Sequence, residues 1–380
     1  MRASWEGPEH QALREAAGRF AAENIAPHAL EWEEAGGFPA DLAQKFADAG
    51  LLGVGYPEAI GGQGGDLSHL LVVQEELVLK GKSVGTVVGG GSHRIALPPI
   101  VKYGTPDQIE RFVRPVLQGR KVAALAITEP GAGSDVASIA TRARRDGDHY
   151  VVDGSKTFIT SGVRADFLTA AVRTGGAGHG GISLLVIERE TPGYSVGRSL
   201  KKMGWWASDT AELSFAGCRV PVANLIGPEN AGFALIAGNF VEERLLLAGN
   251  CVAIAELAFR ESVAFARQRQ AFGRPILGFQ TTRHKLAEMV TRITATRAFL
   301  DDVVRRHLAG DDAMGLAAML KNTASDLVTA VCDEAVQIHG GYGFMREYVV
   351  ERLYRDARLY PIGGGTREIM WEIVGKLQGW

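Results

Sequence analysis

Residues 125–135 read LAITEPGAGSD and join an apolar run to a glycine-rich turn. The apolar run occupies residues 122–127, and a run of this length bounded by proline and glycine predicts a buried strand that enters a tight loop. Pro130 fixes its own φ and offers no N–H donor, and the two glycines after it allow a ligand to approach the backbone. The segment therefore predicts a loop that presents backbone N–H groups and the hydroxyls of Thr128 and Ser134 to a flat, polar ligand.

A second segment, residues 154–162, reads GSKTFITSG and has the same order of residue types: glycine, a short β run with an aromatic side chain, two hydroxyls and a glycine. Either segment alone is equally consistent with an ordinary strand and turn. Together they resemble the pair of segments that contacts the flavin in acyl-CoA dehydrogenases. The resemblance implies that FAD is the cofactor, that donors around Thr128 and Thr160 contact its isoalloxazine, and that Phe158 packs near the ring.

The composition argues against several other classes of protein. The chain has 380 residues, enough for two or three domains, and its formal net charge of −2 gives no electrostatic surface for nucleic acid or an anionic membrane. Its three cysteines are far apart in the sequence, which indicates a reducing compartment and no structural zinc. No apolar run reaches the length of a membrane span. We therefore expect a cytoplasmic protein without nucleic-acid or membrane partners.

The apolar periodicity divides the chain into three domains. Residues 1–120 repeat with helical spacing, residues 121–228 alternate with period two, and residues 229–380 return to helical spacing. Three long helices and a last one from Glu368 predict an antiparallel four-helix bundle in the third domain. We expect a mainly α fold with a small, β-barrel-like middle domain. This layout resembles the acyl-CoA dehydrogenase fold over essentially the whole chain.

One glycine-rich loop has a second interpretation. Gly176, Gly178 and Gly181 form a G-x-G-x-x-G pattern, which is the fingerprint of dinucleotide-binding Rossmann units. The pattern follows a predicted strand at residues 166–172 but leads into another at residues 182–187, so no helix N-terminus is available for a pyrophosphate. We therefore interpret this segment as a plain hairpin loop.

Further motifs match the family in order and spacing. Residues 269–273 with Gln280 resemble its RxxFG…Q motif, residues 337–344 its QxxGGxGF segment, and residues 203–204 with 208–210 its MG…SDT stretch. The resemblance implies that the first motif holds the pyrophosphate and adenosine of FAD across a subunit boundary, and that the backbone of the second also packs on FAD. The residues assigned to FAD by resemblance are Ile127, Thr128, Ser134, Phe158, Thr160, Arg269, Phe272, Gln280, Gln337, Gly340, Gly341, Thr366 and Glu368.

The C-terminal turn departs from the family's commonest pattern. Many members read Tyr-Glu-Gly-Thr there, with the glutamate as catalytic base, whereas residues 363–366 read GGGT and Gly364 takes the glutamate's place. Glu243 and Arg244 fall in register with the Glu-Arg pair of the isovaleryl-CoA and long-chain dehydrogenases, which place the base on this helix. We therefore expect Glu243 to be the base. The alternative is a helix N-terminal carboxylate favoured only by the helix dipole, in a catalytically inactive relative.

The resemblance also implies how the substrate is held. Ser134, Arg244, Gly364 and Gly365 are assigned to the acyl-CoA, with Arg244 near the CoA moiety. The missing side chains of the glycine turn, with residues 89–91 nearby by resemblance, predict room for a branched or medium-length acyl group. No metal is expected, because the histidines lack the spacing of metal ligands.

The predicted reaction is the α,β-dehydrogenation of an acyl-CoA thioester to the trans-2-enoyl-CoA. A base removes the α-proton while the β-hydrogen leaves as a hydride to flavin N5. The resemblance implies an electron-transfer flavoprotein as acceptor, a homotetramer built from dimers, and a place in fatty acid or branched-chain amino acid catabolism. The alternatives are a flavin oxidase or monooxygenase on the same fold, and a non-catalytic relative that binds acyl-CoA or FAD.

Overall fold

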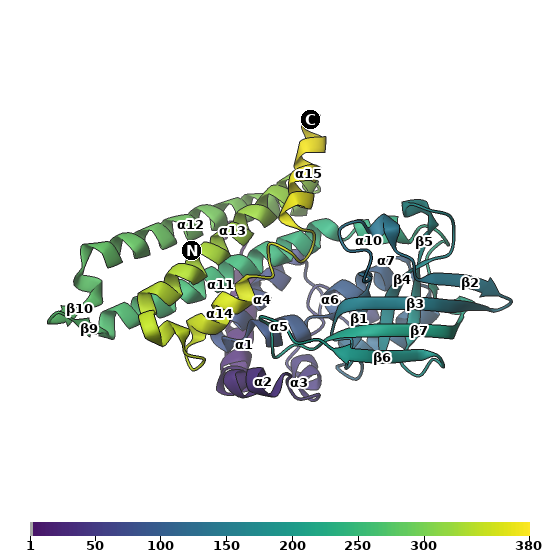
Figure 1. Cartoon of the computed structure of the whole chain (residues 1–380), viewed down its shortest axis with the longest axis horizontal. Helices are drawn as coiled ribbons and strands as arrows, with labels where there is room; N and C mark the ends of the chain where they lie inside the picture. Colours follow the sequence, from purple (N-terminus) through teal and green to yellow (C-terminus); the bar gives the residue numbers. More distant parts are fainter. Residues whose placement is uncertain (1–2) are drawn as a thin grey trace.

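The computed structural model describes residues 3–380, and the chain folds into helices up to Leu117 (Figure 1). Thr105 and Gln108 form a capping box: Oγ1 of Thr105 accepts the N–H of Gln108 at 3.2 Å, and Oε1 of Gln108 accepts the N–H of Thr105 at 3.1 Å. The helices are α1 (Pro8–Asn24), α2 (Ala29–Ala35), α3 (Leu42–Asp48), α4 (Leu67–Gly81), α5 (Val84–Gly90), α6 (His93–Ala96), α7 (Pro98–Tyr103), α8 (Pro106–Gln108), a π-helical turn (Ile109–Val113) and α9 (Arg114–Leu117).

The middle of the chain forms one sheet with the strand order β6-β7-β3-β2-β4-β5-β8, and β1 pairs with β4 in parallel. The strands β2 and β3 form a hairpin, with Arg142 opposite Asp153. The glycine-rich loop between β4 and β5 contains only a three-residue 3₁₀ turn and joins antiparallel strands, so it is a hairpin loop. The strands are β1 (Ala123–Ala126), β2 (Arg142–Asp146), β3 (His149–Thr160), β4 (Phe167–Arg173), β5 (Ile182–Glu188), β6 (Tyr194–Ser199), β7 (Thr210–Pro221) and β8 (Leu225–Ile226).

The strands β4 and β5 are buried on both faces, which explains why their sequences are mostly apolar, with Thr169 and Ser183 as the buried exceptions. Alternate residues of β4 face two different cores. Phe167 packs in a cluster with Leu97, Phe112 and other residues of α6–α9, whereas Leu168 packs with Tyr150 inside the sheet domain. The N-terminal helices therefore cover one face of the sheet and fix it to the rest of the molecule.

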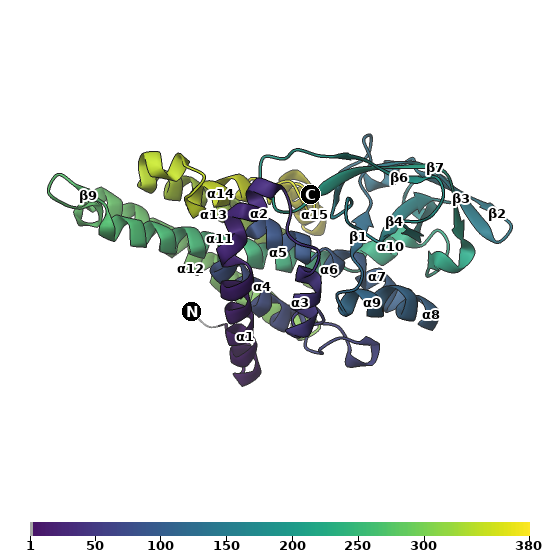
Figure 2. The same cartoon turned by 90° about the horizontal axis from the view of Figure 1, so that it is seen from below.

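Three long helices dominate the C-terminal part, as predicted, and they extend away from the sheet along the longest dimension of the molecule (Figures 1 and 2). Buried apolar residues line the predicted stripe of α12, including Leu286, Ile293 and Leu300. The elements are α10 (Gly232–Ala237), α11 (Phe240–Gln268), β9 (Gln270–Ala271), β10 (Arg274–Pro275), α12 (Gln280–Leu308), α13 (Met314–His339), α14 (Val349–Ala357) and α15 (Arg367–Leu377).

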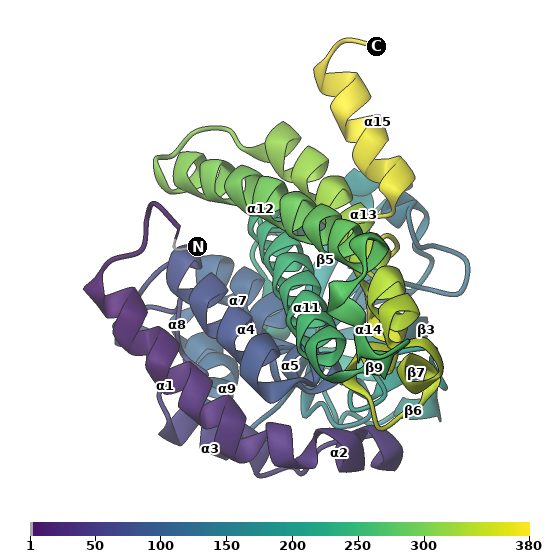
Figure 3. The same ribbon diagram turned by 90° about the vertical axis from the view of Figure 1, so that its left-hand side faces the viewer.

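An additional helix, α14, follows a short 3₁₀ turn at Gly340–Phe344 and was not predicted from the sequence. The last helix, α15, begins at Arg367, one residue earlier than predicted, and projects from the end of the bundle (Figure 3). The predicted fold class, helices followed by a β domain and a helical C-terminal part, is confirmed. Within residues 3–380, no helix has both the length and the apolar character needed to cross a membrane.

A loop of the β domain, residues 203–209, connects the three parts. The N–H of Trp205 donates to Oδ1 of Asp356 on α14 at 2.5 Å, and the N–H of Ala207 donates to Oε1 of Glu33 on α2 at 3.0 Å. All four residues are buried. Two carboxylates from the two helical parts thus hold one strand-connecting loop between them.

The loop approaches α14 so closely that only glycine fits at position 204. A Cβ on Gly204 would lie 2.6 Å from the carbonyl oxygen of Arg355 and 2.7 Å from Oδ1 of Asp356. We therefore expect Gly204→Ala to lower the free energy of unfolding by about 1–3 kcal/mol, the usual cost of overpacking. Thermal and urea unfolding would measure this. The control is Gly176→Ala, where a Cβ would meet no atom within 4 Å, and equal effects of the two substitutions would contradict the assignment.

Candidate functional site

The two glycine-rich segments identified first in the sequence meet around a buried ion pair. Nζ of Lys156 lies 2.8 Å from Oε1 of Glu129 and donates to the carbonyl oxygen of Ile127 at 2.9 Å. The same carboxylate accepts the N–H groups of Ala140 at 2.6 Å and Thr141 at 3.0 Å. Lys156 is 1% exposed and Glu129 is 7% exposed. Both carboxylate oxygens of Glu129 therefore have hydrogen-bond partners in the protein interior.

Each charge of this pair stabilises the ionised form of the other residue. Burial alone would raise the pKa of Glu129, but the adjacent ammonium and the hydrogen bonds outweigh burial and lower it. Burial lowers the pKa of Lys156 to about 8, against the attraction of the carboxylate. Neither residue was identified from the sequence as important. The sequence did contain a signal for this pair, because one acidic residue, Glu129, and one basic residue, Lys156, each lie inside one of the two glycine-rich segments.

The predicted flavin residues of the β domain lie on adjacent backbone. The N–H of Thr157 donates to the carbonyl oxygen of Thr128 at 2.9 Å, which aligns the two segments. Phe158 is 67% exposed and has a φ of 59°, at an irregularity in the β3–β7 pairing. A large apolar residue in the left-handed region is strained and usually marks a functional site. Thr160 ends β3 beside it.

The loop after β1 leaves open space for a ligand. A Cβ on Gly131 or Gly133 would meet no atom of the described residues within 4 Å, and Ser134 is exposed. Neither glycine is required by a positive φ or by contact inside the chain. Together with the exposed ring of Phe158, the residues of this loop fit a flat, polar cofactor.

A second set of predicted flavin residues gathers at the far end of the long helices. Arg269 follows α11, and its guanidinium lies 5.5 Å from the ring centroid of Tyr342. Arg269, Gly340 and Gly341 line a surface hollow of about 490 Å³. Phe272 is 96% exposed, with a φ of 51°. The exposed residues Gln280, at the start of α12, and Gln337, near the end of α13, complete this set.

Within one chain, the predicted flavin residues of the β domain and those at the far end of the long helices do not meet. The helix α11 has 29 residues, and at 1.5 Å per residue it is about 43 Å long. The β domain lies at the N-terminal end of this helix, and β9 and β10, which contain the RxxFG segment, lie at its other end (Figure 1). A single FAD does not span this length.

The predicted base and the C-terminal glycine turn do meet. Oε1 of Glu243 lies 3.7 Å from the position that a Cβ on Gly364 would occupy. Gly364 has a φ of 67°, and Cδ1 of Leu247 lies only 2.3 Å from that same Cβ position. Burial raises the pKa of Glu243, while the positive charges of Arg244 and Lys321 act in the opposite direction. The structure therefore places one carboxylate beside the turn, as the resemblance to the Glu-Arg members implied.

The neighbouring charged residues of α11 differ sharply from one another. Glu242 is exposed, and its Oε1 lies 3.5 Å from Nε2 of His307. Arg244 is buried, its guanidinium lies 5.3 Å from the ring centroid of Phe240, and its Nε has no hydrogen-bond partner among the described residues. Burial lowers the pKa of Arg244. A buried guanidinium with a free donor fits a ligand oxygen, in keeping with its predicted place near CoA.

The turn itself is held from α13 by residues that the sequence analysis missed. Nζ of Lys321 donates to the carbonyl oxygen of Gly365 at 2.6 Å, and Nδ2 of Asn322 donates to that of Arg367 at 3.0 Å. Oγ1 of Thr366 accepts the N–H of Ile369 at 3.3 Å and caps α15, whereas Glu368 is exposed. The sequence did contain a signal for this role, because Lys321 and Asn322 are polar residues inside the apolar stripe of α13.

Gly89, one of the residues expected to leave free space, is closely packed. A Cβ on Gly89 would lie 2.8 Å from Cε1 of Phe38 and 3.1 Å from Oγ of Ser208. The glycine therefore lets α5 approach its neighbours closely and leaves no room for an acyl group at that position. Gly363 is less crowded, with Leu359 the nearest neighbour at 3.7 Å.

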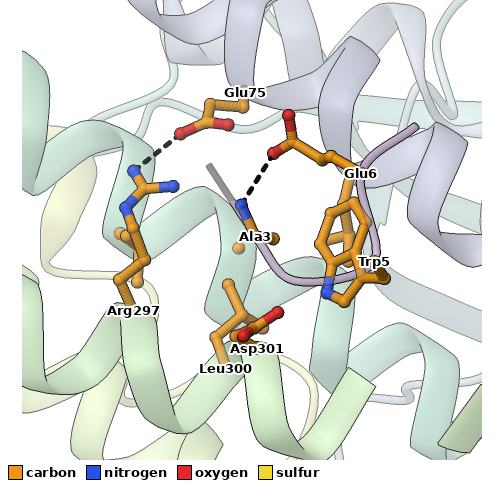
Figure 4. A pocket seen from close by; sticks show the side chains of 10 residues that line it. Ala3, Trp5, Glu6, Glu75, Arg297, Leu300 and Asp301 are labelled. Carbon is orange, nitrogen blue, oxygen red and sulfur yellow. Dashed lines mark hydrogen bonds and ion pairs between the residues drawn. The ribbon is translucent and has the colours of Figure 1, made fainter. Parts of the chain in front are cut away.

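Two other features have structural roles. A cavity of about 30 Å³ lies between the N-terminal segment and the helices α4, α11 and α12, and the ion pair of Arg297 with Glu75, at 2.6 Å, borders it (Figure 4). This volume holds a water molecule or two at most, and no predicted site residue lines the cavity.

A cluster of Glu9, His10 and His69 has potential ligand atoms within 4.8 Å of one another. Both ring nitrogens of His10 are engaged, because Nδ1 accepts the N–H of Gly7 at 3.0 Å and Nε2 lies 2.8 Å from Oγ of Ser68. We therefore assign this cluster to the capping of α1 and α4.

Comparisons with known proteins agree over the whole chain. Family models described as the N-terminal, middle and C-terminal domains of acyl-CoA dehydrogenase match residues 7–120, 124–218 and 230–378. The long-chain specific acyl-CoA dehydrogenase of mouse mitochondria is 41% identical over 97% of this chain and 86% of its own length.

Solved structures give the same result. The crystal structure of a "probable acyl CoA dehydrogenase" from Mycobacterium abscessus is 50% identical, with a TM-score of 0.98 over 99% of this chain and 100% of that one. The FAD complex of PigA is 26% identical, with a TM-score of 0.94 over 98% of each chain.

The buried pair of Glu129 and Lys156 makes a direct prediction. Lys156→Met leaves a buried carboxylate without its counter-charge, which we expect to lower the free energy of unfolding by about 3–5 kcal/mol. Urea unfolding would measure this loss. The double variant Glu129→Gln, Lys156→Met removes both charges and should recover part of it, because the remaining amide needs no counter-ion. A single variant as stable as the wild type would contradict the role given to the pair.

Proposed function

Because the chain belongs to the acyl-CoA dehydrogenase family, we propose that it is a FAD-dependent enzyme that forms a trans double bond between the α and β carbons of an acyl-CoA thioester. The observation that carries this proposal is the position of Glu243. Its carboxylate lies beside Gly364, at the turn where other members carry their base.

Glu243 takes the α-proton in the proposed reaction. Burial raises its pKa, which brings this carboxylate closer to the range in which a base is both ionised and able to accept a proton at neutral pH. Glu242, next to it on the helix, is exposed and paired with His307. The two residues therefore differ in environment although they are adjacent in sequence.

The glycine turn supplies donors for the thioester oxygen. The N–H groups of Gly364 and Gly365 have no hydrogen-bond partner among the described residues, so they are free to face the negative charge that develops as the α-proton leaves. Donors fixed in place before the reaction stabilise such charge without reorganising. The carbonyl of Gly365 is held by Lys321, which limits movement of the turn.

FAD is the proposed cofactor, and when bound it would accept the β-hydrogen as a hydride. The residues that would hold it are Thr128, Phe158 and Thr160 of the β domain and, from the other end of a second chain, Arg269 and Gln337. The exposed Phe158 and the open glycines of the loop after β1 support this assignment.

The assembly we propose is a homotetramer built from dimers, because the two sets of flavin residues lie at opposite ends of α11 (Figure 1). An electron-transfer flavoprotein is the proposed acceptor. Three free, buried cysteines support a reducing compartment, for which we propose the cytoplasm. The division into domains at residues 120 and 228 stays a prediction.

The substrate remains proposed as a branched or medium-length acyl-CoA, now on narrower grounds. A Cβ on Gly89 would lie too close to Phe38, and Leu247 fills the place beside Gly364. The lack of a side chain at Gly363 is the remaining support.

Anaerobic mixing with a panel of acyl-CoAs tests the proposal. We expect the flavin of the wild type to be reduced without oxygen, with the highest kcat/KM for a branched or medium-length substrate. Peroxide or an oxygenated product in air would indicate an oxidase or monooxygenase, and no reduction by any thioester would indicate a non-catalytic relative. A kcat/KM highest for butyryl-CoA would contradict the substrate proposal.

Glu243→Gln tests the base within the same assay. The amide keeps the shape of the side chain but not its basicity, so we expect FAD and acyl-CoA to bind while the rate of flavin reduction falls roughly 10²–10⁴-fold. Glu242→Gln, about 100° around the helix, is the matched control and should have little effect. Reduction of the flavin by Glu243→Gln at the wild-type rate would show that the base lies elsewhere.

Arg269→Ala tests the shared cofactor site. Removing the guanidinium should lower FAD retention and weaken the dimer together, because the same residue serves the neighbouring chain. Sedimentation and flavin absorbance would measure both. Arg267→Ala, an exposed arginine in the last turn of α11, is the control. A monomer that retains one FAD per chain would disprove the cross-subunit assignment.

A further inference from the structure

A buried lysine supports the glycine turn at the end of the chain. Lys321, on α13, is 1% exposed, and its Nζ donates to the carbonyl oxygen of Gly365 at 2.6 Å. Within residues 3–380, no carboxylate lies within 4.0 Å of this ammonium. Lys156, the comparable buried lysine, does have such a partner in Glu129. The ammonium of Lys321 is therefore held in the interior by a neutral carbonyl.

An uncharged donor would be enough to hold a carbonyl. Asn322 does so one residue later, where its Nδ2 donates to the carbonyl oxygen of Arg367 at 3.0 Å. Ser325 does so one turn further on, where its Oγ donates to the carbonyl oxygen of Tyr360 at 3.2 Å. Burying an unpaired ammonium costs far more than burying an amide or a hydroxyl. The charge at position 321 therefore calls for an explanation other than attachment of the turn.

The charged groups around Lys321 provide that explanation. Lys321 interacts electrostatically with two groups of titratable residues. Glu243, Arg244 and Cys251 lie on α11, and Arg367 and Glu368 lie on α15. Burial lowers the pKa of Lys321 to about 8, Arg244 and Arg367 act in the same direction, and Cys251 and Glu243 oppose them. In return, the positive charge of Lys321 lowers the pKa of Glu243 against the effect of burial.

We propose that Lys321 is a positioning residue for the reaction, whose buried ammonium fixes the glycine turn through the Gly365 carbonyl and places a positive charge at the same turn that the carboxylate of Glu243 approaches at Gly364. This role rests on the proposed dehydrogenation. Lys321 contacts neither the α-carbon nor the thioester. It acts through the turn, whose N–H groups meet the developing enolate charge, and through Glu243, whose pKa its positive charge lowers against the effect of burial.

The pH dependence of flavin reduction separates charge from attachment. In single-turnover mixing with acyl-CoA, we expect Lys321→Met to be slower by 10-fold or more. Its acidic limb should move to higher pH, because Glu243 loses a neighbouring positive charge. We expect the wild type to show a basic limb as Lys321 loses its proton, because burial lowers the pKa of Lys321 to about 8, and this limb should be absent from Lys321→Met. Asn322→Ala loosens the same turn without changing a charge, so it should be slower with both limbs unmoved.

A second variant and a second readout complete the test. Lys321→Arg keeps the charge, so its acidic limb should stay in place and its basic limb should move to higher pH; this variant also serves if Lys321→Met does not fold. Infrared titration of the Glu243 carboxyl in the FAD-loaded protein, with Glu243→Gln as the blank, follows ionisation without turnover. Its midpoint should be higher in Lys321→Met than in the wild type.

The outcomes distinguish this proposal from the proposed function. If Lys321→Met is slower but leaves both limbs and the infrared midpoint unchanged, the lysine is only an anchor and the proposal is wrong. If no thioester reduces the wild-type flavin, the proposed dehydrogenation fails, and the infrared titration still decides whether Lys321 controls the ionisation of Glu243.

Discussion

The buried contact between Glu129 and Lys156 is the interaction on which the β-domain part of the site depends. It joins the glycine-rich loop after β1 to strand β3, across 27 residues of sequence, and with them the exposed Phe158 and the hydroxyls of Thr128 and Thr160. Loops with many glycines have a high conformational entropy, so weak contacts alone would not hold them in one arrangement. A charge pair with every carboxylate oxygen satisfied does hold them, because any other arrangement leaves a buried charge unpaired.

The two long helices α11 and α13 perform a comparable task at the other part of the site. The first carries Glu243 near its start, and the second carries Lys321, so the base and the support of the glycine turn come from rigid elements packed side by side. The turn itself contributes backbone only. The side chains proposed to act in the reaction thus lie on helices, and these helices hold the flexible glycine turn.

Much of this arrangement follows from the sequence. Alternating and helical periods gave the order of helices, strands and helices, and glycine with hydroxyls marked the two loops of the β domain. The pairing of Glu129 with Lys156 and of Lys321 with the Gly365 carbonyl did not follow, because both depend on which elements pack together. The short helix α14 was missed although its buried apolar residues Val350, Leu353 and Ala357 recur at helical spacing. The close packing of Gly89 did not follow from the sequence, because a missing side chain means close packing as often as it means free space, and only the neighbours Phe38 and Ser208 decide which.

The separation of the two flavin sets along α11 also has a genetic consequence. In the proposed assembly, each site takes its base from one chain and its distant cofactor contacts from another. A dimer that combines a chain altered at Glu243 with a chain altered at Arg269 would then carry both defects in one site and neither in the other. Two inactive alleles of this protein would therefore complement each other within one oligomer, whereas two alleles altered at the same end of the helix would not.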